Sequence, residues 1–183
     1  MNQFKSLNPN SHVHLLHPRQ TILCTAHHQK KVNIITLAWT MIISRNPPIV
    51  AISVAPQRYT HDLIKESKQF TINVPTKEIM KEVYYCGSHS GRRVDKFKET
   101  QLHPLEGIKV ACPRIQECIA HLECQVIDAH TYGDHTLFIG KVVTCLGKDD
   151  VLKNNKIDVE KVEIPYHLSG KEFCFNKKEI FRV

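Results

Sequence analysis

The chain has 183 residues, of which 42% are apolar and 23% are charged. These proportions exclude a disordered or fibrous protein and are those of a globular chain long enough to bury its own core. The formal net charge of +7 and the pI near 9.0 favour anionic partners such as nucleotides, phosphates or nucleic acid. Nucleic acid is the less favoured of these partners, because the basic residues are spread out with no run of five or more.

The seven cysteines include no Cys-x-x-Cys pair, and the twelve histidines lack the paired spacing of a structural zinc site. An odd number of cysteines in a chain of this length argues against a disulfide scaffold, so we expect reduced thiols in the cytoplasm and no metal. The first ten residues lack the apolar core of a secretion signal. The most apolar run, residues 34–43, is too short to span a bilayer, so a soluble protein without membrane segments is expected.

Six segments have the composition of strands, and a prolyl pair at Pro47 and Pro48 separates two of them because proline cannot donate ladder hydrogen bonds. In the fifth, apolar residues alternate with His121, Glu123 and Gln125, and this period of two predicts that the latter face water. The predicted strands are residues 21–26, 32–43, 49–55, 70–74, 118–126 and 136–145.

Short helices are predicted between these strands. Thr60 can cap a helix that has Asp62 in its first turn, and a second helix over residues 77–85 is expected to stop at Gly87. A helical turn follows at residues 94–98, and residues 132–135 form the hairpin turn before the last long strand. Strands with small helical insertions predict a closed antiparallel sheet in a single domain of residues 1–183.

Chemistry-bearing side chains concentrate in residues 32–60. A plain core hairpin has little need of an aromatic ring and several hydrogen-bonding groups followed by a basic and a hydroxyl side chain. That mixture suits a planar, phosphorylated ligand. The residues concerned are Asn33, Thr36, Trp39, Thr40, Ser53, Arg58 and Thr60.

Other features have both a structural and a functional interpretation. Residues 87–93 read as a solvated turn, and no phosphate-loop or dinucleotide fingerprint is present, but Arg92 or Lys96 nearby can reach a phosphate. His135 is either a surface turn histidine or a group at the mouth of a site. Trp39 on a strand is compatible with ordinary core packing. Cys118 and Cys124 share an apolar face and are expected in the core.

Several segments occur in one order along nearly the whole chain: HPRQTILCTA, VNIITLAWT, PPIVAISVAPQRYTHDLI, FTINVP, HSGRRVDKF, GDHTLFIGKV and YHLSGKEF. Together they resemble the flavin reductase-like family of FMN-binding split barrels, which includes flavoredoxins and flavin reductase components. The resemblance implies a mainly β fold, a six-stranded antiparallel Greek-key split barrel with short peripheral helices. It also implies a homodimer with FMN near the subunit interface.

The resemblance further implies roles for particular residues. One strand would lie along the isoalloxazine ring, another segment would hold the phosphate and ribityl chain, and His135 would stand near the flavin as the catalytic residue. The implied cofactor-binding residues are Asn33, Thr36, Ala38, Trp39, Ser53, Arg58, Thr60, Ser90, Lys96 and Phe173. Their chemistry agrees with FMN, whose phosphate needs cationic hydrogen-bond donors and whose redox chemistry requires no nucleophile–base triad.

The leading functional hypothesis is an FMN-binding oxidoreductase that passes electrons from NAD(P)H or a redox-partner protein to free flavin, ferric iron or another acceptor. A flavoredoxin-like electron carrier without nicotinamide binding is the alternative, and the sequence does not separate the two, because such a nicotinamide site has no Rossmann fingerprint. A basic β-barrel that binds single-stranded nucleic acid is a third hypothesis. It is disfavoured by an aromatic content of 7% and by the apolar neighbours of those aromatics.

Overall fold

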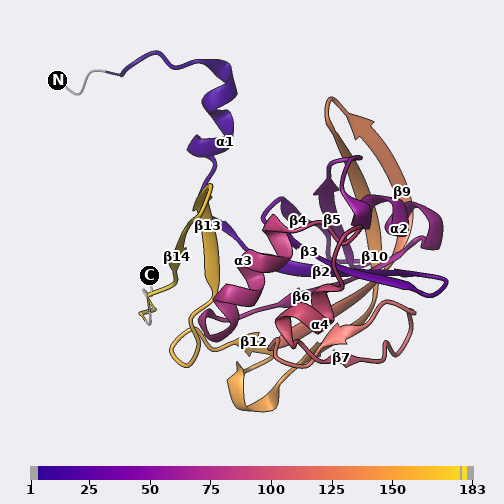
Figure 1. Ribbon diagram of the computed structural model, residues 1–183. Coiled ribbons are helices and arrows are strands. Elements are labelled where there is room, and N and C mark those ends of the chain that lie inside the picture. Colours follow the sequence, from indigo (N-terminus) through magenta and orange to yellow (C-terminus); the bar gives the residue numbers. More distant parts are fainter. Residues whose placement is uncertain (1–3, 178, 181–183) are drawn as a thin grey trace.

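The computed structural model describes residues 4–177 and 179–180, and antiparallel strands form most of its regular secondary structure (Figure 1). One large sheet has the order β3-β2-β6-β9-β10-β5-β4. Because β3 also contacts β5 near the other end of this order, the sheet curls into a barrel. The strands are β2 (Ile22–His28), β3 (Lys31–Leu37), β4 (Thr40–Ser44), β5 (Ile49–Val54), β6 (Gln69–Val74), β9 (Ala120–Tyr132) and β10 (His135–Gly147).

Smaller elements surround the barrel. The α-helices are α1 (His12–Leu15), α2 (Tyr59–Ser67), α3 (Met80–Ser88) and α4 (Lys96–Thr100), and the 3-10 turns are η1 (Pro9–Ser11), η2 (Lys77–Ile79) and η3 (Asp149–Val151). The remaining strands form three small sheets: β1 (Arg19–Gln20) with β13 (Pro165–Ser169) and β14 (Glu172–Phe175), β7 (Pro104–Leu105) with β8 (Arg114–Ile115), and β11 (Leu152–Lys153) with β12 (Lys156–Ile157). Among the described residues, no helix has the length and apolar character needed to cross a membrane.

The mainly β antiparallel fold is confirmed, but the large sheet has seven strands and not six. The single strand predicted over residues 32–43 is wrong, because the chain breaks pairing at Ala38 and Trp39. Residues before the break pair with β2, and residues after it pair with β5. The Trp39 carbonyl accepts a hydrogen bond from the backbone N–H of Ser53 at 3.0 Å, which ties the crossing to β5. Barrel closure, which no local pattern records, splits this strand.

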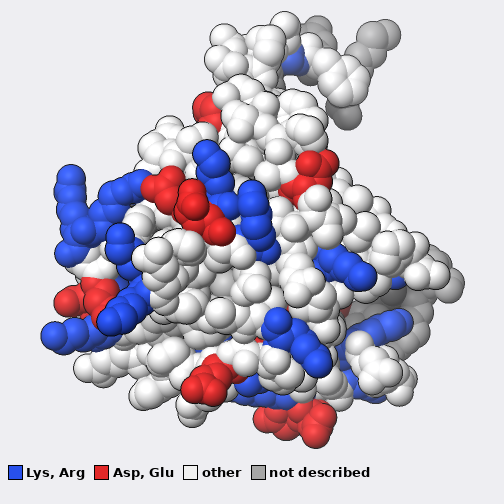
Figure 2. Space-filling model, turned by 90° about the vertical axis from the view of Figure 1, so that its right-hand side faces the viewer, with Lys and Arg blue, Asp and Glu red and all other residues white. Residues whose placement is uncertain are grey.

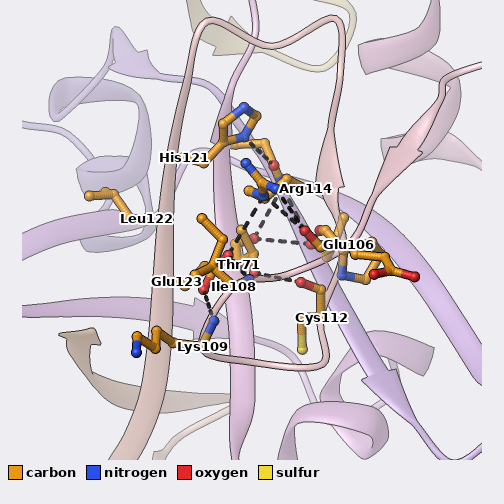
Figure 3. Close-up of polar contacts among 12 residues, drawn as sticks. Thr71, Glu106, Ile108, Lys109, Cys112, Arg114, His121, Leu122 and Glu123 are labelled. Atoms are coloured by element: carbon orange, nitrogen blue, oxygen red, sulfur yellow. Dashed lines mark hydrogen bonds and ion pairs between the residues drawn. The ribbon is translucent and has the colours of Figure 1, made fainter. Parts of the chain in front are cut away.

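The prediction that the polar side chains of β9 face water is right for Gln125, which is exposed, but wrong for His121 and Glu123. His121 is 7% exposed and Glu123 is fully buried. Segment 106–113, which contains neither helix nor strand, folds over this part of the strand (Figure 3). The Glu123 carboxylate accepts hydrogen bonds from the backbone N–H groups of Ile108 at 2.8 Å and Lys109 at 2.7 Å. Cys118 and Cys124 lie in the core, as predicted.

Side chains from β6 and β8 accept or donate hydrogen bonds for the backbone of segment 106–113, which pairs with no strand that the structure describes. The Thr71 hydroxyl donates to the Cys112 carbonyl at 3.1 Å, and the Arg114 guanidinium donates to the Glu106 carbonyl at 2.8 Å (Figure 3). Arg114 also lies 3.7 Å from the Glu123 carboxylate. A buried carboxylate is stable only with such partners, so these contacts fix the segment in one conformation.

The helices form near their predicted positions with different ends. Helix α2 begins at Tyr59, with Arg58 in the capping position, so the prediction of Thr60 as the N-cap is wrong. The Thr60 hydroxyl instead accepts a hydrogen bond from Asn33. Helix α3 does not stop at Gly87 but continues to Ser88. The hairpin turn before β10 is confirmed, and Gly133 adopts the positive φ of 60° that such turns require.

Candidate functional site

Seven of the predicted site residues line one cavity of about 540 Å³, which we call the Trp39 cavity. It lies where β3 passes into β4, beside the end of β5, and is bounded by α3 and by the β13–β14 hairpin. The predicted residues that line it are Thr36, Ala38, Trp39, Ser53, Arg58, His135 and Phe173.

An aromatic pair forms one wall of the Trp39 cavity. The rings of Trp39 and His135 have centroids 4.5 Å apart and are tilted by 36°. His135 is placed by the start of β10, and its Nδ1 lies 2.7 Å from a carboxylate oxygen of Asp134. This hydrogen bond lowers the pKa of Asp134 and orients the imidazole. The His135 side chain keeps 25% of its surface exposed, so the imidazole is partly accessible from outside.

The cationic end of the Trp39 cavity is supplied by the residue before α2. Arg58 has extended backbone angles (φ −79°, ψ 133°), and its N–H donates to the Ala55 carbonyl at 3.0 Å in a tight turn out of β5. Among the described residues, its guanidinium forms no ion pair or hydrogen bond. Ser53, on β5, likewise has a hydroxyl without a partner in the described chain. Both groups are therefore available to a ligand.

Helix α3 packs closely on β3 to form the opposite wall. The Thr36 hydroxyl donates to the Val83 carbonyl at 2.5 Å, which anchors the helix to the strand. A Cβ atom added at Gly87 would lie 3.2 Å from the Cβ of Thr36, so a larger residue would push the helix away. Gly87 therefore contributes to the site by having no side chain, which lets α3 approach β3, and it does not end the helix.

Three further predicted residues, Asn33, Thr60 and Lys96, are buried behind the cavity wall and do not line it. Asn33 donates to the Thr60 hydroxyl at 2.7 Å. The Lys96 ammonium donates to the carbonyls of Ile34 at 2.7 Å and Cys86 at 2.5 Å, so it joins α3 to β3. Burial lowers the pKa of Lys96 to about 8, and the nearby Arg58 charge adds to this shift.

Ser90, the remaining predicted residue, is exposed and also lies outside the cavity lining. Its hydroxyl accepts a hydrogen bond from the backbone N–H of Arg92 at 3.3 Å. Ser90 therefore shapes the loop between α3 and α4. The structure does not bring its side chain to the Trp39 cavity.

The β13–β14 hairpin covers the cavity with side chains that sequence reasoning largely missed. Phe173 was predicted, and its ring centroid lies 5.2 Å from that of His167. Lys171 places its ammonium 5.9 Å from the ring centroid of Tyr84 on α3. Other residues of the lining that were not predicted are Ile35, Leu37, Val54, Ala55, Val83, Tyr84, Gly87, Ser88, His167, Gly170 and Lys171. No sequence pattern marks Tyr84 or His167, because their position depends on how helix and hairpin pack.

The Trp39 cavity combines apolar and aromatic walls with a few polar groups at its rim. Its volume falls within the range of roughly 300–1,000 Å³ that is common for small-molecule sites. The unpaired guanidinium of Arg58 and hydroxyl of Ser53 fit a planar ring that carries an anionic tail. Among the described residues, no group of His, Cys, Asp and Glu side chains is arranged to hold a metal ion.

Comparison with known proteins agrees with this chemistry. A family model described as a flavin reductase like domain matches residues 14–171. An uncharacterised protein of Pyrococcus abyssi is 34% identical over 169 residues, which cover 92% of this chain and 96% of that protein. An NADH-dependent FAD reductase of Streptomyces globisporus is 30% identical over 103 residues, or 56% of each chain.

The fold also matches solved structures. The crystal structure of a flavoredoxin from Methanosarcina acetivorans superimposes with a TM-score of 0.89 at 24% identity, covering 99% of this chain and 95% of that chain. At this identity the likeness concerns the fold. The predicted split-barrel architecture is thereby confirmed, and the predicted cofactor, FMN, agrees with the family that the sequence matches.

Proposed function

The chain belongs to the flavin reductase-like domain family, and on this basis we propose that it is an FMN-dependent oxidoreductase whose cofactor occupies the Trp39 cavity. The observation that carries the proposal is the juxtaposition of an aromatic, apolar slot with an unpaired arginine at one end. When bound, FMN supplies the hydride and electron transfer chemistry.

Different residues of the Trp39 cavity bind different parts of the cofactor. Arg58 binds the phosphate with charge-assisted hydrogen bonds, and Ser53 donates a further hydrogen bond. Trp39 and Phe173 cover apolar ring surface and exclude water. His135, held by Asp134 and accessible from outside, orients the molecule that exchanges electrons with the cofactor.

The buried residues behind the wall act on the site through the backbone. Lys96 holds the last turn of α3 against β3, and the hydrogen bond between Asn33 and Thr60 holds the start of α2 against the same strand. Both contacts fix the distance between Arg58 and the α3 wall. We therefore assign Asn33, Thr60 and Lys96 as positioning residues for the cofactor.

We propose NAD(P)H as the electron donor and free flavin, ferric iron or a redox-partner protein as the acceptor. The relative named as an NADH-dependent FAD reductase supports a nicotinamide donor. The alternative is a flavoredoxin-like carrier that takes electrons from a protein, and the structural likeness to a flavoredoxin supports it. All seven cysteines are free, which suits the reducing cytoplasm that we propose as its location.

We also propose that the protein is a homodimer. The edge strand β4 presents an apolar surface on which Met41, Ile42 and Ile43 are 54%, 77% and 45% exposed. Contiguous apolar surface of this kind is typical of protein interfaces. Sedimentation of the purified protein tests this: a monomer of 21.1 kDa at micromolar concentration would contradict the proposal.

An absorption spectrum of the purified protein with added FMN, followed by anaerobic NADH and then NADPH, tests the function. Protein-bound flavin bands that bleach with either nucleotide are the expected result and name the donor. Bound flavin that stays oxidised with both nucleotides would establish the carrier alternative. A protein that retains no FMN after gel filtration and gives no reductase turnover would contradict the proposal.

A further inference from the structure

A second and larger cavity lies on another face of the molecule. This open groove of about 940 Å³, which we call the Lys30 groove, runs between the β2–β3 hairpin, the segment around α4 and segment 106–113. Its apolar floor and walls include Val32, Phe97, Leu105, Val110 and Pro113. The groove shares no lining residue with the Trp39 cavity.

One wall of the Lys30 groove is held rigid by buried charges. Segment 106–113 supplies this wall, and the Glu123 carboxylate anchors it by accepting the N–H groups of Ile108 and Lys109 (Figure 3). The Gln69 side chain accepts a third N–H, that of Ala111, at 2.9 Å. A loop whose backbone is satisfied in this way needs little ordering when a ligand arrives, which favours binding.

The rim of the groove is basic, and most of its cations lack protein partners. Lys30, Lys31 and Arg93 are exposed and form no ion pair with any residue that the structure describes. Figure 2, which views the side toward which the β2–β3 hairpin points in Figure 1, shows Lys and Arg spread over this face with fewer Asp and Glu between them.

The other charged groups of the groove are already engaged or lie at its edge. Arg92 is fixed above the Tyr59 ring at 5.3 Å, donates to the Gln57 carbonyl and pairs with the Asp62 carboxylate. Asp95 caps α4 by accepting the N–H of Lys98. Glu106 is the remaining carboxylate of the lining, so cations outnumber anions around the groove.

A partition separates the groove from the Trp39 cavity. Gly91 lines the groove and lies so close to Asn33 that an added Cβ would stand 2.0 Å from the Asn33 side-chain oxygen. Asn33 is buried and bonded to Thr60, so no open path joins the two sites at this point. A ligand in the Lys30 groove therefore does not occupy the volume proposed for FMN.

We propose that the Lys30 groove is a second binding site, specific for a small organic anion with an apolar or planar body and a sulfonate, carboxylate or phosphate group. The apolar walls take the body of the ligand, and Lys30, Lys31 and Arg93 take its charge. The proposal is independent of the proposed function, because it concerns a different cavity.

Calorimetric titration of FMN-saturated protein with 8-anilinonaphthalene-1-sulfonate tests the site, with N-phenyl-1-naphthylamine as the uncharged counterpart of the same body. We expect one sulfonate probe per chain, bound at least tenfold more tightly than the naphthylamine. The variant Lys30→Glu/Lys31→Glu/Arg93→Glu should bind the sulfonate probe at least tenfold more weakly and bind FMN with unchanged affinity.

The matched control is Lys81→Glu/Lys141→Glu, which reverses exposed lysines that line neither cavity and should leave the affinity for the probe within twofold. Equal weakening in the control variant would show general attraction to a basic protein and overturn the proposal. Binding of the naphthylamine as tight as that of the sulfonate, or competition between the probe and FMN, would overturn it as well.

Discussion

Two polar clusters of this protein differ in whether their groups already have partners. Around Glu123, both carboxylate oxygens accept hydrogen bonds from backbone N–H groups, and the Glu123 side chain is fully buried. Around the Trp39 cavity, Arg58 and Ser53 have no partner among the described residues. The first cluster stabilises the fold, and the second is free to bind. Whether a polar group already has a hydrogen-bond partner, more than its residue type, separates the structural groups of this protein from those available to a ligand.

Substitution of Glu123 should break the first cluster and give the largest effect. Glu123→Ala removes the acceptor of the Ile108 and Lys109 N–H groups and the ion-pair partner of Arg114, at a cost of roughly 3–5 kcal/mol in the free energy of unfolding. Urea unfolding measures this cost. The control Glu160→Ala removes a surface ion pair with Lys153 and should cost less than about 1 kcal/mol. Comparable losses in the two variants would contradict the structural role of Glu123.

Acid should destabilise the same region through His121, whose Nδ1–H donates to the Asn73 side-chain oxygen at 2.8 Å. Burial, followed by nearby Arg114 and Lys148, lowers the pKa of His121 from 6.5 to about 4. Between these two pKa values the unfolded chain binds a proton at His121 and the folded chain does not. The free energy of unfolding is therefore highest above pH 6.5 and falls by roughly 3 kcal/mol as the pH drops toward 4. His121→Gln should lose this part of the pH dependence in urea titrations. If the unfolding free energy of the variant depends on pH as steeply as that of the wild type, His121 is not the group responsible.

Removal of the Arg58 side chain should weaken FMN binding and leave the free energy of unfolding nearly unchanged, whereas substitution of Glu123 lowers the free energy of unfolding. Arg58→Ala takes away an exposed side chain without intramolecular partners, so FMN affinity should fall by about 1.5–3 kcal/mol while the unfolding free energy stays within about 0.5 kcal/mol. Fluorescence titration of FMN measures the first quantity. Lys141→Ala, outside the cavity, serves as the control. Unchanged FMN affinity in Arg58→Ala would place the phosphate elsewhere.

The smallest expected effect concerns His135, which we propose orients the reacting molecule. His135→Ala should lower turnover roughly tenfold, the loss expected for one interaction worth about 1.4 kcal/mol in the transition state. Bound flavin should change by less than about twofold. Steady-state kinetics and the flavin content of the same sample give both numbers. Equal losses in turnover and flavin content would make His135 a cofactor ligand only.

Local patterns predicted most strands and the general position of the helices, because alternation and β-branched composition act over a few residues. They failed where distant segments decide the outcome. The strand over residues 32–43 splits because the barrel closes at Trp39, and His121 and Glu123 are buried because segment 106–113 covers them. That segment has no periodicity from which its position could be inferred.

The site was predicted in the same uneven way. Residues beside the strand crossing, such as Trp39 and Arg58, stand out by their chemistry and do line one cavity. Tyr84 and His167 were missed because they reach the cavity through packing of α3 and the β13–β14 hairpin. Lys96 was identified from a motif, but only the fold shows that its ammonium bonds to backbone carbonyls.

A crystal structure of the protein soaked with FMN tests the central claim most directly. We predict flavin density in the Trp39 cavity, with the phosphate at Arg58 and the ring system beside Trp39. Flavin bound in the Lys30 groove or elsewhere, with the Trp39 cavity filled only by water, would contradict the assignment of the cofactor site.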